Sequence, residues 1–355
     1  MPPAEESPVD RLPSAPTTAQ PPAATDANRA PQASRTSRRG QPFAEGDLVQ
    51  LTDPKHRHHT FPLQVGGAFF THKGSLAHDD IIGRPEGIVV TSSGGTSYLV
   101  LRPMLRDFVL SMKRGATIVY PKDAAAIVSL ADLFPGARVV EAGAGSGALS
   151  ISLLQTVGEH GYVSSYELRE DFARVARQNV SRWLGGDPPA WRLTVGSVME
   201  HLAGEAALDA VILDLLGPWE AVGPAAQALV PGGLIVAYVA TTTQLSRFVE
   251  TLREHDGFTE PQAQETMVRT WHAEGLAVRP DHRMVAHTGF LVAARRLAPG
   301  TSTLQLRRRP AKGAYSEDYT GPRGAHVPAR QQPSAQPVPQ DDSSGADLPG
   351  DRDDT

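Results

Sequence analysis

Cysteine is missing from the whole chain of 355 residues. Its absence excludes disulfide bonds, zinc sites with cysteine ligands and catalysis by a thiol nucleophile. Long apolar runs are also missing, and no stretch could span a bilayer. The N-terminus lacks the charged and then apolar order of a signal peptide. We therefore expect a soluble, cytoplasmic protein that does not associate with membranes.

An excess of positive charge is missing as well. The chain has 34 Lys and Arg against 39 Asp and Glu, a formal net charge of −5. A balance of this kind gives no overall cationic signal for nucleic acid. Six aspartates lie between positions 341 and 354, so the total says little about the surface of a folded domain.

Large apolar residues are scarce at both ends of the chain. Residues 1–40 are rich in Pro, Ala, Ser, Thr and Gln, and residues 301–355 turn polar, with Pro, Gly, Arg and Asp. Segments of this composition cannot bury enough apolar surface to offset the entropy cost of ordering. We predict a disordered tail over each range.

Residues 41–102 contain short alternations of apolar and polar residues, separated by turn residues. Closely spaced short strands without a helical period predict a small all-β, barrel-like domain. The expected strands are Glu45–Asp53, Thr60–Val65, Ala68–Thr71, Gly87–Thr91 and Ser97–Leu101.

Five histidines fall in this segment, namely His56, His58, His59, His72 and His78. Histidine is a common metal ligand, so a metal site is one interpretation. Their spacing does not match a clean ligand pattern, and no cysteine assists. We favour histidines that face solvent or RNA, and we predict no metal.

Residues 103–300 repeat a strand and helix order that is typical of a parallel α/β sheet. The expected strands are Arg138–Ala142, Tyr162–Glu167, Trp191–Val195, Asp209–Asp214 and Leu234–Val239. The expected helices between them are Gly147–Val157, Glu170–Trp183, Glu220–Leu229 and Thr242–His255. Before the sheet we expect a helix at Arg106–Met112, a strand at Ile118–Asp123 and a helix at Ala124–Leu133. Gln264–Trp271 and Gly289–Arg295 are predicted to add an antiparallel pair at the sheet edge.

A glycine-rich turn follows the first of these strands, with Gly143, Gly145 and Gly147 before a helix. Glycine allows tight turns and a close approach to a ligand, and the free N–H groups of the helix face that ligand. Such turns occur in dinucleotide-binding and in S-adenosylmethionine-binding folds. Glu141 precedes the turn and would repel a pyrophosphate, so the methyl donor with its cationic methionine end is favoured.

Acidic residues end two further strands. Glu167 ends the second strand, where an acid commonly accepts hydrogen bonds from ribose hydroxyls. Asp214 ends the fourth strand, where the carboxyl ends of adjacent strands meet at the ligand crevice. Trp219 follows in a loop that resembles those of enzymes that methylate amino groups on bases. Ser197 and Val198 follow the third strand, where methyltransferases often carry an aspartate for the adenine amino group.

Together these motifs resemble the tRNA (adenine-58-N1)-methyltransferase family in its bacterial, actinobacterial form. The resemblance covers about residues 43–300. It rests on Tyr120–Asp123, Glu141–Gly147, Tyr166-Glu167, Asp214–Trp219, Tyr238–Gln244, Arg279-Pro280, His287–Leu291 and the N-terminal runs Phe43–Asp47 and Thr71–Gly74.

The resemblance implies a Rossmann-like class I methyltransferase sheet behind the small β domain, and a homotetramer. It implies methyl transfer from S-adenosylmethionine to N1 of the T-loop adenine of tRNA, with Asp214 at the target base. Ser146, Gly147, Ala148 and Leu149 would hold the methionine end, Glu167 the ribose, and Phe172 would lie near the adenine. Tyr120, Trp219 and Tyr238 are candidate walls for the flipped base. The expected cofactor site comprises Glu141, Gly143, Gly145, Ser146, Gly147, Ala148, Leu149, Glu167, Phe172, Ser197, Val198 and Asp214.

Two alternatives remain from the sequence. A protein methyltransferase of the isoaspartate-repair type would share the sheet, although the Asp214–Trp219 loop and the β domain argue against it. A protein that binds the cofactor or RNA without catalysis would share the glycine turn.

Overall fold

A computed structural model describes residues 39–304, 313–316 and 318–321. By its contacts the chain divides into Met1–Gln41 and Pro42–Thr355, and nearly all of the first unit lies outside the described residues. Most of the predicted tails over 1–40 and 301–355 therefore lies outside them too. The elements below all belong to the second unit.

The N-terminal part of this unit is a small antiparallel β structure. A four-stranded sheet has the order β2-β1-β6-β5, and β3 and β4 form a separate hairpin. The strands are β1 (Leu48–Thr52), β2 (His58–Pro62), β3 (Ala68–Thr71), β4 (Gly74–Ala77), β5 (Ile88–Thr91) and β6 (Ser97–Leu101). Alternation places Tyr98 and Val100 of β6 in the core with Val49 and Leu51 of β1.

β4 has no counterpart among the predicted strands, and β2 begins two residues before and ends three residues before the predicted Thr60–Val65. The β3–β4 turn depends on Gly74, which has φ +94° and lies so close to Gly94 that an added Cβ would be 2.4 Å from its nitrogen. Two loops distant in sequence therefore meet here. The pattern of a four-residue strand does not reveal such a contact.

The rest of the unit is an α/β sheet of seven strands in the order β12-β15-β11-β10-β7-β8-β9. The strands from β11 to β9 in this order are parallel, and β15 and β12 are antiparallel at the edge, as predicted. The strands are β7 (Arg138–Ala142), β8 (Tyr162–Glu167), β9 (Trp191–Val195), β10 (Leu208–Leu213), β11 (Leu229–Val239), β12 (Gln262–Gln264) and β15 (Phe290–Arg295).

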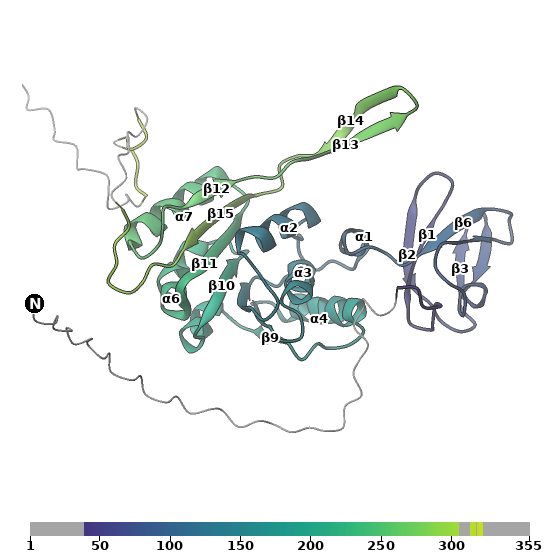
Figure 1. Ribbon diagram of the computed structural model, residues 1–355, viewed down its shortest axis with the longest axis horizontal. Coiled ribbons are helices and arrows are strands. Elements are labelled where there is room, and N and C mark those ends of the chain that lie inside the picture. The colour runs from purple at the N-terminus through teal and green to yellow at the C-terminus, as the bar shows by residue number, and fades with distance from the viewer. Residues whose placement is uncertain (1–38, 305–312, 317, 322–355) are drawn as a thin grey trace, which may run out of the picture. The chain divides into compact units, whose positions relative to one another are not determined.

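Helices cover both faces of this sheet (Figure 1). One core joins alternate strand residues such as Val139 and Ile212 to α1 (Leu105–Ser111), α2 (Pro121–Leu130), α3 (Ala148–Val157) and α4 (Glu170–Leu184). The other joins Val140 and Ile235 to α5 (Val198–His201), α6 (Val222–Ala228) and α7 (Thr242–His255). Strands that are apolar on both faces are typical of parallel sheets.

Two predicted elements before the sheet need correction. Ile118–Tyr120 forms no strand, because Ile118 and Val119 are buried in the helix-covered core without strand partners. The next helix begins at Pro121 rather than Ala124 and ends at Leu130. Proline is well suited to the first helical position, because its missing N–H has no partner there in any case.

The predicted edge pair is correct only in part. Gln264 pairs with Leu291, but the strand from Val268 onward leaves the sheet. β13 (Val268–Glu274) and β14 (Ala277–Val285) form their own antiparallel hairpin, which pairs with no other strand in the described part of the chain. Within the described residues, no helix is both long and apolar enough to cross a membrane.

Candidate functional site

The carboxyl ends of β7, β8, β9 and β10 lie at one edge of the sheet, where ligands of open α/β folds bind. The glycine turn at this edge is fixed by backbone contacts. The N–H groups of Gly143 and Ala144 both donate to the carbonyl of Tyr166 at 3.0 Å. Gly143 has φ +89°, and an added Cβ would lie 2.1 Å from the carbonyl oxygen of Asp214. Only glycine fits here.

Ser146 is engaged with a neighbouring loop. Its hydroxyl accepts from the N–H groups of Gly115 and Ala116 at 3.1 and 3.2 Å. The amide of Asn179 in α4 donates to the carbonyls of Ser146 and Lys113 at 2.9 and 2.8 Å. The loop before α2 is thereby held against the glycine turn. Sequence analysis missed Asn179, because a polar residue within a helix carries no signal of such a bridge.

Glu167 is buried and tied to the same turn. Its carboxylate accepts from the N–H of Gly145 at 2.8 Å and from the N–H of Arg169 at 3.0 Å. Two anchored oxygens hold the carboxylate in one orientation and leave lone pairs for further donors. Phe172 is packed beside this region, with the Arg169 guanidinium 3.8 Å above its ring. An added Cβ on Gly115 would lie 2.8 Å from Phe172 Cδ1.

Three carboxylates gather at this edge, and their charges act on one another. Glu141 is fully buried, and one of its oxygens accepts from the hydroxyls of Ser150 and Ser165 at 2.6 and 2.5 Å. Its other oxygen has no hydrogen-bond partner among the described residues. Burial raises the pKa of Glu141 to about 7. Burial, and next the charge of Glu167, raise the pKa of the partly buried Asp214 to about 7. A bound cation would relieve this repulsion.

The third strand contributes Gly196, Ser197 and Val198. Ser197 is the N-cap of α5, and its hydroxyl accepts from the N–H of Met199 at 3.2 Å. The N–H of Gly196 donates to the carbonyl of Glu167 at 2.9 Å, so this loop follows the end of β8. Val198 is buried in the core beneath it.

Tyr238 lies within the electrostatic reach of Asp214 and of Tyr120. The Tyr238 hydroxyl donates to the carbonyl of Thr288 at 2.7 Å. Burial raises the pKa of Tyr238 to about 12, with smaller contributions from the charges of Asp123 and Asp214 and from Tyr120. These interactions place Tyr120, Tyr238 and Asp214 in one neighbourhood.

A buried clamp that sequence analysis missed supports this neighbourhood. The Lys122 ammonium donates to Asp123 at 2.7 Å and to the Thr288 hydroxyl at 2.6 Å. That hydroxyl donates to the other oxygen of Asp123 at 2.5 Å. The clamp joins the start of α2 to the residues before β15. These segments are far apart in the sequence, so no local pattern predicts the contact.

Trp219 follows Asp214 in a short turn and is half-buried against the α6 and α7 side of the core. The guanidinium of Arg247 lies 4.0 Å above its ring. One face of the indole is therefore covered, and Leu216 in the same loop is 89% exposed. The loop therefore presents one aromatic side chain held in place, Trp219, and one apolar side chain exposed to solvent, Leu216.

The histidines of the β domain are dispersed. His78 is buried, accepts from the N–H of Gln64 at 3.1 Å and stacks on Phe61. His58 contacts Thr52, and His59 lies against Phe69. Within the described ranges, no group of three or more His, Asp or Glu is arranged to hold a metal ion.

Comparisons with known proteins show which family this chain matches. Residues 42–90 match the family "TrmI-like N-terminal", and residues 97–278 match "tRNA methyltransferase complex GCD14 subunit". The tRNA (adenine(58)-N(1))-methyltransferase TrmI of Thermus thermophilus is 41% identical over 246 residues, which cover 69% of this chain and 95% of the relative.

A relative from Methanocaldococcus jannaschii, named tRNA (adenine(57)-N(1)/adenine(58)-N(1))-methyltransferase TrmI, is 33% identical over 64% of this chain and 87% of its own length. Among solved structures, a SAM-dependent O-methyltransferase from Thermotoga maritima is similar with a TM-score of 0.69 and 30% identity, over 73% of this chain and 96% of that chain. The tRNA (m1A58) methyltransferase TrmI of Aquifex aeolicus has a TM-score of 0.62 and 27% identity, over 72% and 99%. The chain therefore has a class I methyltransferase fold and belongs to the tRNA (adenine-58-N1)-methyltransferase family.

Proposed function

We propose that this chain transfers a methyl group from S-adenosylmethionine to N1 of adenine 58 in the T-loop of tRNA. The observation that carries the proposal is the position of Asp214. It follows the fourth strand, its backbone carbonyl lies against Gly143 of the glycine turn, and its charge acts on Tyr238. We therefore assign its carboxylate to the space that the donor and the base share. The isoaspartate alternative is not favoured, because the chain belongs to a tRNA methyltransferase family.

The residues at the sheet edge fit the methyl donor. Glu141 has a buried oxygen without a partner among the described residues, and Glu167 and Asp214 add negative charge nearby. Such a cluster suits a sulfonium and an ammonium group. Glu167 would accept from the ribose hydroxyls, and residues 146–149 at the start of α3 would hold the methionine end. When bound, this group supplies an electrophilic methyl.

Asp214 would act on the adenine. Its carboxylate would accept a hydrogen bond from the exocyclic amino group, which raises the electron density at N1 and stabilises the cationic methylated ring. It would then accept a proton from that ring. The remaining task is to align N1 with the methyl, and positioning supplies most of that effect.

The base must leave its stack to reach Asp214, which costs a few kcal/mol. Tyr120 and Tyr238 would provide walls for the extruded adenine, and Tyr238 is already fixed through Thr288. Trp219 would shape the pocket from the loop after Asp214. No residue in this scheme needs a metal ion.

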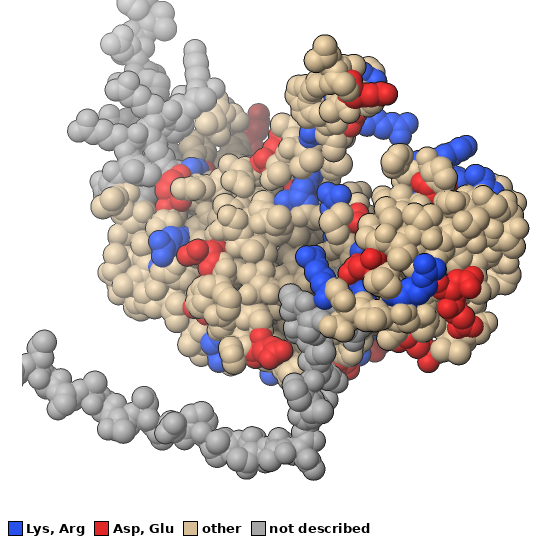
Figure 2. Space-filling view, turned by 45° about the vertical axis from the view of Figure 1, so that its right-hand side comes forward, with Lys and Arg blue, Asp and Glu red and all other residues tan. Residues whose placement is uncertain are grey.

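Contact with the tRNA backbone would come from scattered cations. On the face drawn in Figure 2, lysine and arginine are interspersed with aspartate and glutamate. In the β domain, His58, His59, Lys73 and Arg84 are candidates for phosphate contacts. Each neutralised phosphate adds to the salt dependence of binding.

We further propose a cytoplasmic homotetramer. The β13–β14 hairpin bears large apolar side chains in the open, with Trp271 63% and Val278 60% exposed. Contiguous apolar patches of this kind mark interaction sites. A second copy of the chain is the natural partner for the hairpin in a homotetramer.

The test is mass spectrometry of nucleosides from unmodified tRNA incubated with the protein and labelled S-adenosylmethionine. We expect labelled 1-methyladenosine, which disappears when position 58 is changed to guanine. Methyladenosine that persists in the changed tRNA would contradict the assigned target. A partial digest to oligonucleotides, sequenced by mass spectrometry, reports whether adenine 57 is modified. An isoaspartyl peptide serves as the control acceptor.

A further inference from the structure

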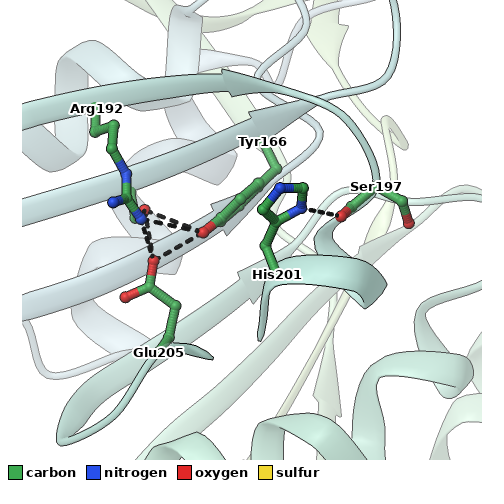
Figure 3. A network of polar contacts seen from close by, with 6 residues as sticks. Tyr166, Arg192, Ser197, His201 and Glu205 are labelled. Atoms are coloured by element: carbon green, nitrogen blue, oxygen red, sulfur yellow. Dashed lines mark hydrogen bonds and ion pairs between the residues drawn. The ribbon is translucent and has the colours of Figure 1, made fainter. Parts of the chain in front are cut away.

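A polar network beneath the β8–β9 edge involves residues that the scheme above does not use (Figure 3). The Tyr166 side chain is 2% exposed, and its hydroxyl donates to Glu205 at 2.8 Å. Arg192 and the hydroxyl of Ser164 donate to the same Glu205 oxygen, each at 2.8 Å. Three donors on one carboxylate oxygen fix the Tyr166 ring firmly.

The same residue sets the glycine turn. The carbonyl of Tyr166 accepts from the N–H groups of both Gly143 and Ala144. Tyr166 thus links the network to the loop that would hold the methyl donor. Any group that rests on its ring acquires a fixed position relative to that loop.

The imidazole of His201 packs against the ring of Tyr166. Its ring centre lies 5.4 Å from that of Tyr166, at an interplanar angle of 36°. Its Nδ1 lies 2.9 Å from the carbonyl oxygen of Ser197. A carbonyl only accepts, so Nδ1 carries the proton and donates.

His201 also fills the space beneath the preceding glycine. Gly196 has φ +149°, and an added Cβ would lie 3.2 Å from His201 Cε1. The imidazole therefore touches both residues of the Gly196–Ser197 loop, which runs beside Glu167. Because His201 is itself exposed, its removal opens no cavity in the core.

We propose that His201 is a positioning residue for the adenosine half of the cofactor. It holds the Gly196–Ser197 loop at a set distance from the glycine turn, with the Tyr166 ring as the shared support. This inference rests on the proposed function, because it assumes that the adenosine lies between these two loops. His201 touches neither the methyl group nor the target base.

The first test is His201→Ala, with Glu200→Ala as the matched control on the same short helix. We expect the Kd and KM for S-adenosylmethionine to rise about tenfold, the joint effect of one hydrogen bond and one ring contact. The kcat at saturating cofactor should stay within about twofold, because Asp214 and the base pocket are untouched. Glu200→Ala should change neither parameter.

Two conservative variants separate the contacts. His201→Asn keeps a donor near the Nδ1 position, and His201→Phe keeps the ring without the donor. Each should recover part of the affinity, to within about threefold of wild type. A merely structural role would instead lower the melting temperature and kcat together, without this graded recovery.

A second ligand locates the effect. 5′-Methylthioadenosine lacks the methionine end, so its Kd should rise by the same factor in His201→Ala. A loss seen with S-adenosylmethionine alone would overturn the assignment to the adenosine half. Wild type that binds no S-adenosylmethionine would refute the proposed function, whereas wild type that binds it as tightly as His201→Ala would refute only this inference.

Discussion

Asp214 is the residue on which the proposed chemistry depends most directly. We predict that Asp214→Asn lowers the single-turnover rate of methyl transfer by about 10²–10⁴-fold, the range for a lost general base. The amide keeps the size of the side chain but cannot accept the proton. Rates should be measured at saturating cofactor and tRNA, with the exposed Glu220→Gln as control. A rate within threefold of wild type would contradict the assigned role.

The same residue sets a pH dependence. The pKa of Asp214 is raised to about 7, and the ionised form is the active one. For the free protein, kcat/KM should therefore fall about tenfold per pH unit below pH 7 and level off above it. A bound cation favours the ionised carboxylate, so the corresponding limb of kcat should lie at lower pH. The Asp214→Asn variant should have no such limb.

Glu141 offers a test through stability rather than activity. Burial raises its pKa from 4.5 to about 7, so the folded state favours the protonated form. The stabilisation from this preference is fully present below pH 4.5 and is lost as the pH rises through 7. In Glu141→Gln nothing titrates. Between pH 5 and pH 8, the free energy of unfolding should shift in favour of the variant by about 2–3 kcal/mol.

Urea unfolding at both pH values measures this shift. The amide also places a donor where the unpartnered oxygen was, so at pH 5 the variant should be less stable than wild type. A difference between the two proteins that does not change with pH would show that Glu141 has the same pKa in the folded and the unfolded state.

At the residue scale, a site residue can be predicted from the sequence when its role follows from its place at the end of a strand. Glu167 ends a strand and the glycines follow one, and both residue types are typical of a nucleotide-binding turn at that place. Asn179, Thr288 and His201 could not be predicted in this way, because each contacts a residue that only the fold brings close, or a backbone atom. A helix interior or a loop gives no sign that one polar side chain will bridge two carbonyls.

The turn between β7 and α3 is the element whose geometry is most tightly constrained. We predict that Gly143→Ala destabilises the protein by more than about 2 kcal/mol and abolishes cofactor binding. A left-handed backbone costs an alanine about 1–2 kcal/mol, and the added Cβ also meets the Asp214 carbonyl at 2.1 Å. Gly136→Ala is the matched control, because φ is +102° there but no atom lies within 4 Å. Equal losses in both variants would mean that the contact with Asp214 contributes nothing.

The clamp between α2 and the start of β15 can be tested by Thr288→Val, which keeps the shape and removes the hydroxyl. Lys122 and Asp123 then each lose a partner in a buried position, so we expect a loss of about 1–3 kcal/mol in unfolding free energy. Tyr238 keeps its bond to the carbonyl but loses a fixed support, so the KM for tRNA should rise. The control is Thr251→Val, at a half-buried site of α7 where the hydroxyl donates to a carbonyl of its own helix, and it should alter neither quantity. If Thr288→Val also alters neither quantity, the clamp contributes nothing.

Element boundaries were predicted best where one pattern ran the whole length of the element. β7, β9 and α7 have the predicted residues. β7 is buried over four consecutive residues, the apolar residues of β9 alternate with polar ones, and the buried apolar residues of α7 follow a helical period. Ile118–Tyr120 has strand composition but no strand neighbour, so composition alone was misleading. The β13–β14 hairpin was missed because its apolar side chains are exposed, and the pattern of a strand on a sheet edge assumes that they are buried.

At the scale of the whole molecule, the exposed apolar side chains of the β13–β14 hairpin are the feature that calls for a partner surface. A two-stranded hairpin is marginally stable in water by itself, and Leu276 at its turn is fully exposed beside Trp271 and Val278. The sequence predicted the class I sheet and the preceding β domain, because both follow from the order of strands and helices. It could not place these apolar side chains, because they lie on a hairpin outside the seven-stranded sheet.

The double variant Trp271→Ser, Val278→Thr tests the proposed self-association. Both side chains are polar afterwards, and each remains compatible with a strand, so the hairpin keeps its pairing while losing apolar area. Light scattering after size exclusion should give a tetramer for wild type and a smaller species for the variant, because each buried Å² contributes roughly 25 cal/mol. Val65→Thr, which changes an equally exposed apolar residue in the β domain, should stay tetrameric. A monomeric wild type would refute the tetramer, and a variant of unchanged mass would mean that the subunits associate through another surface.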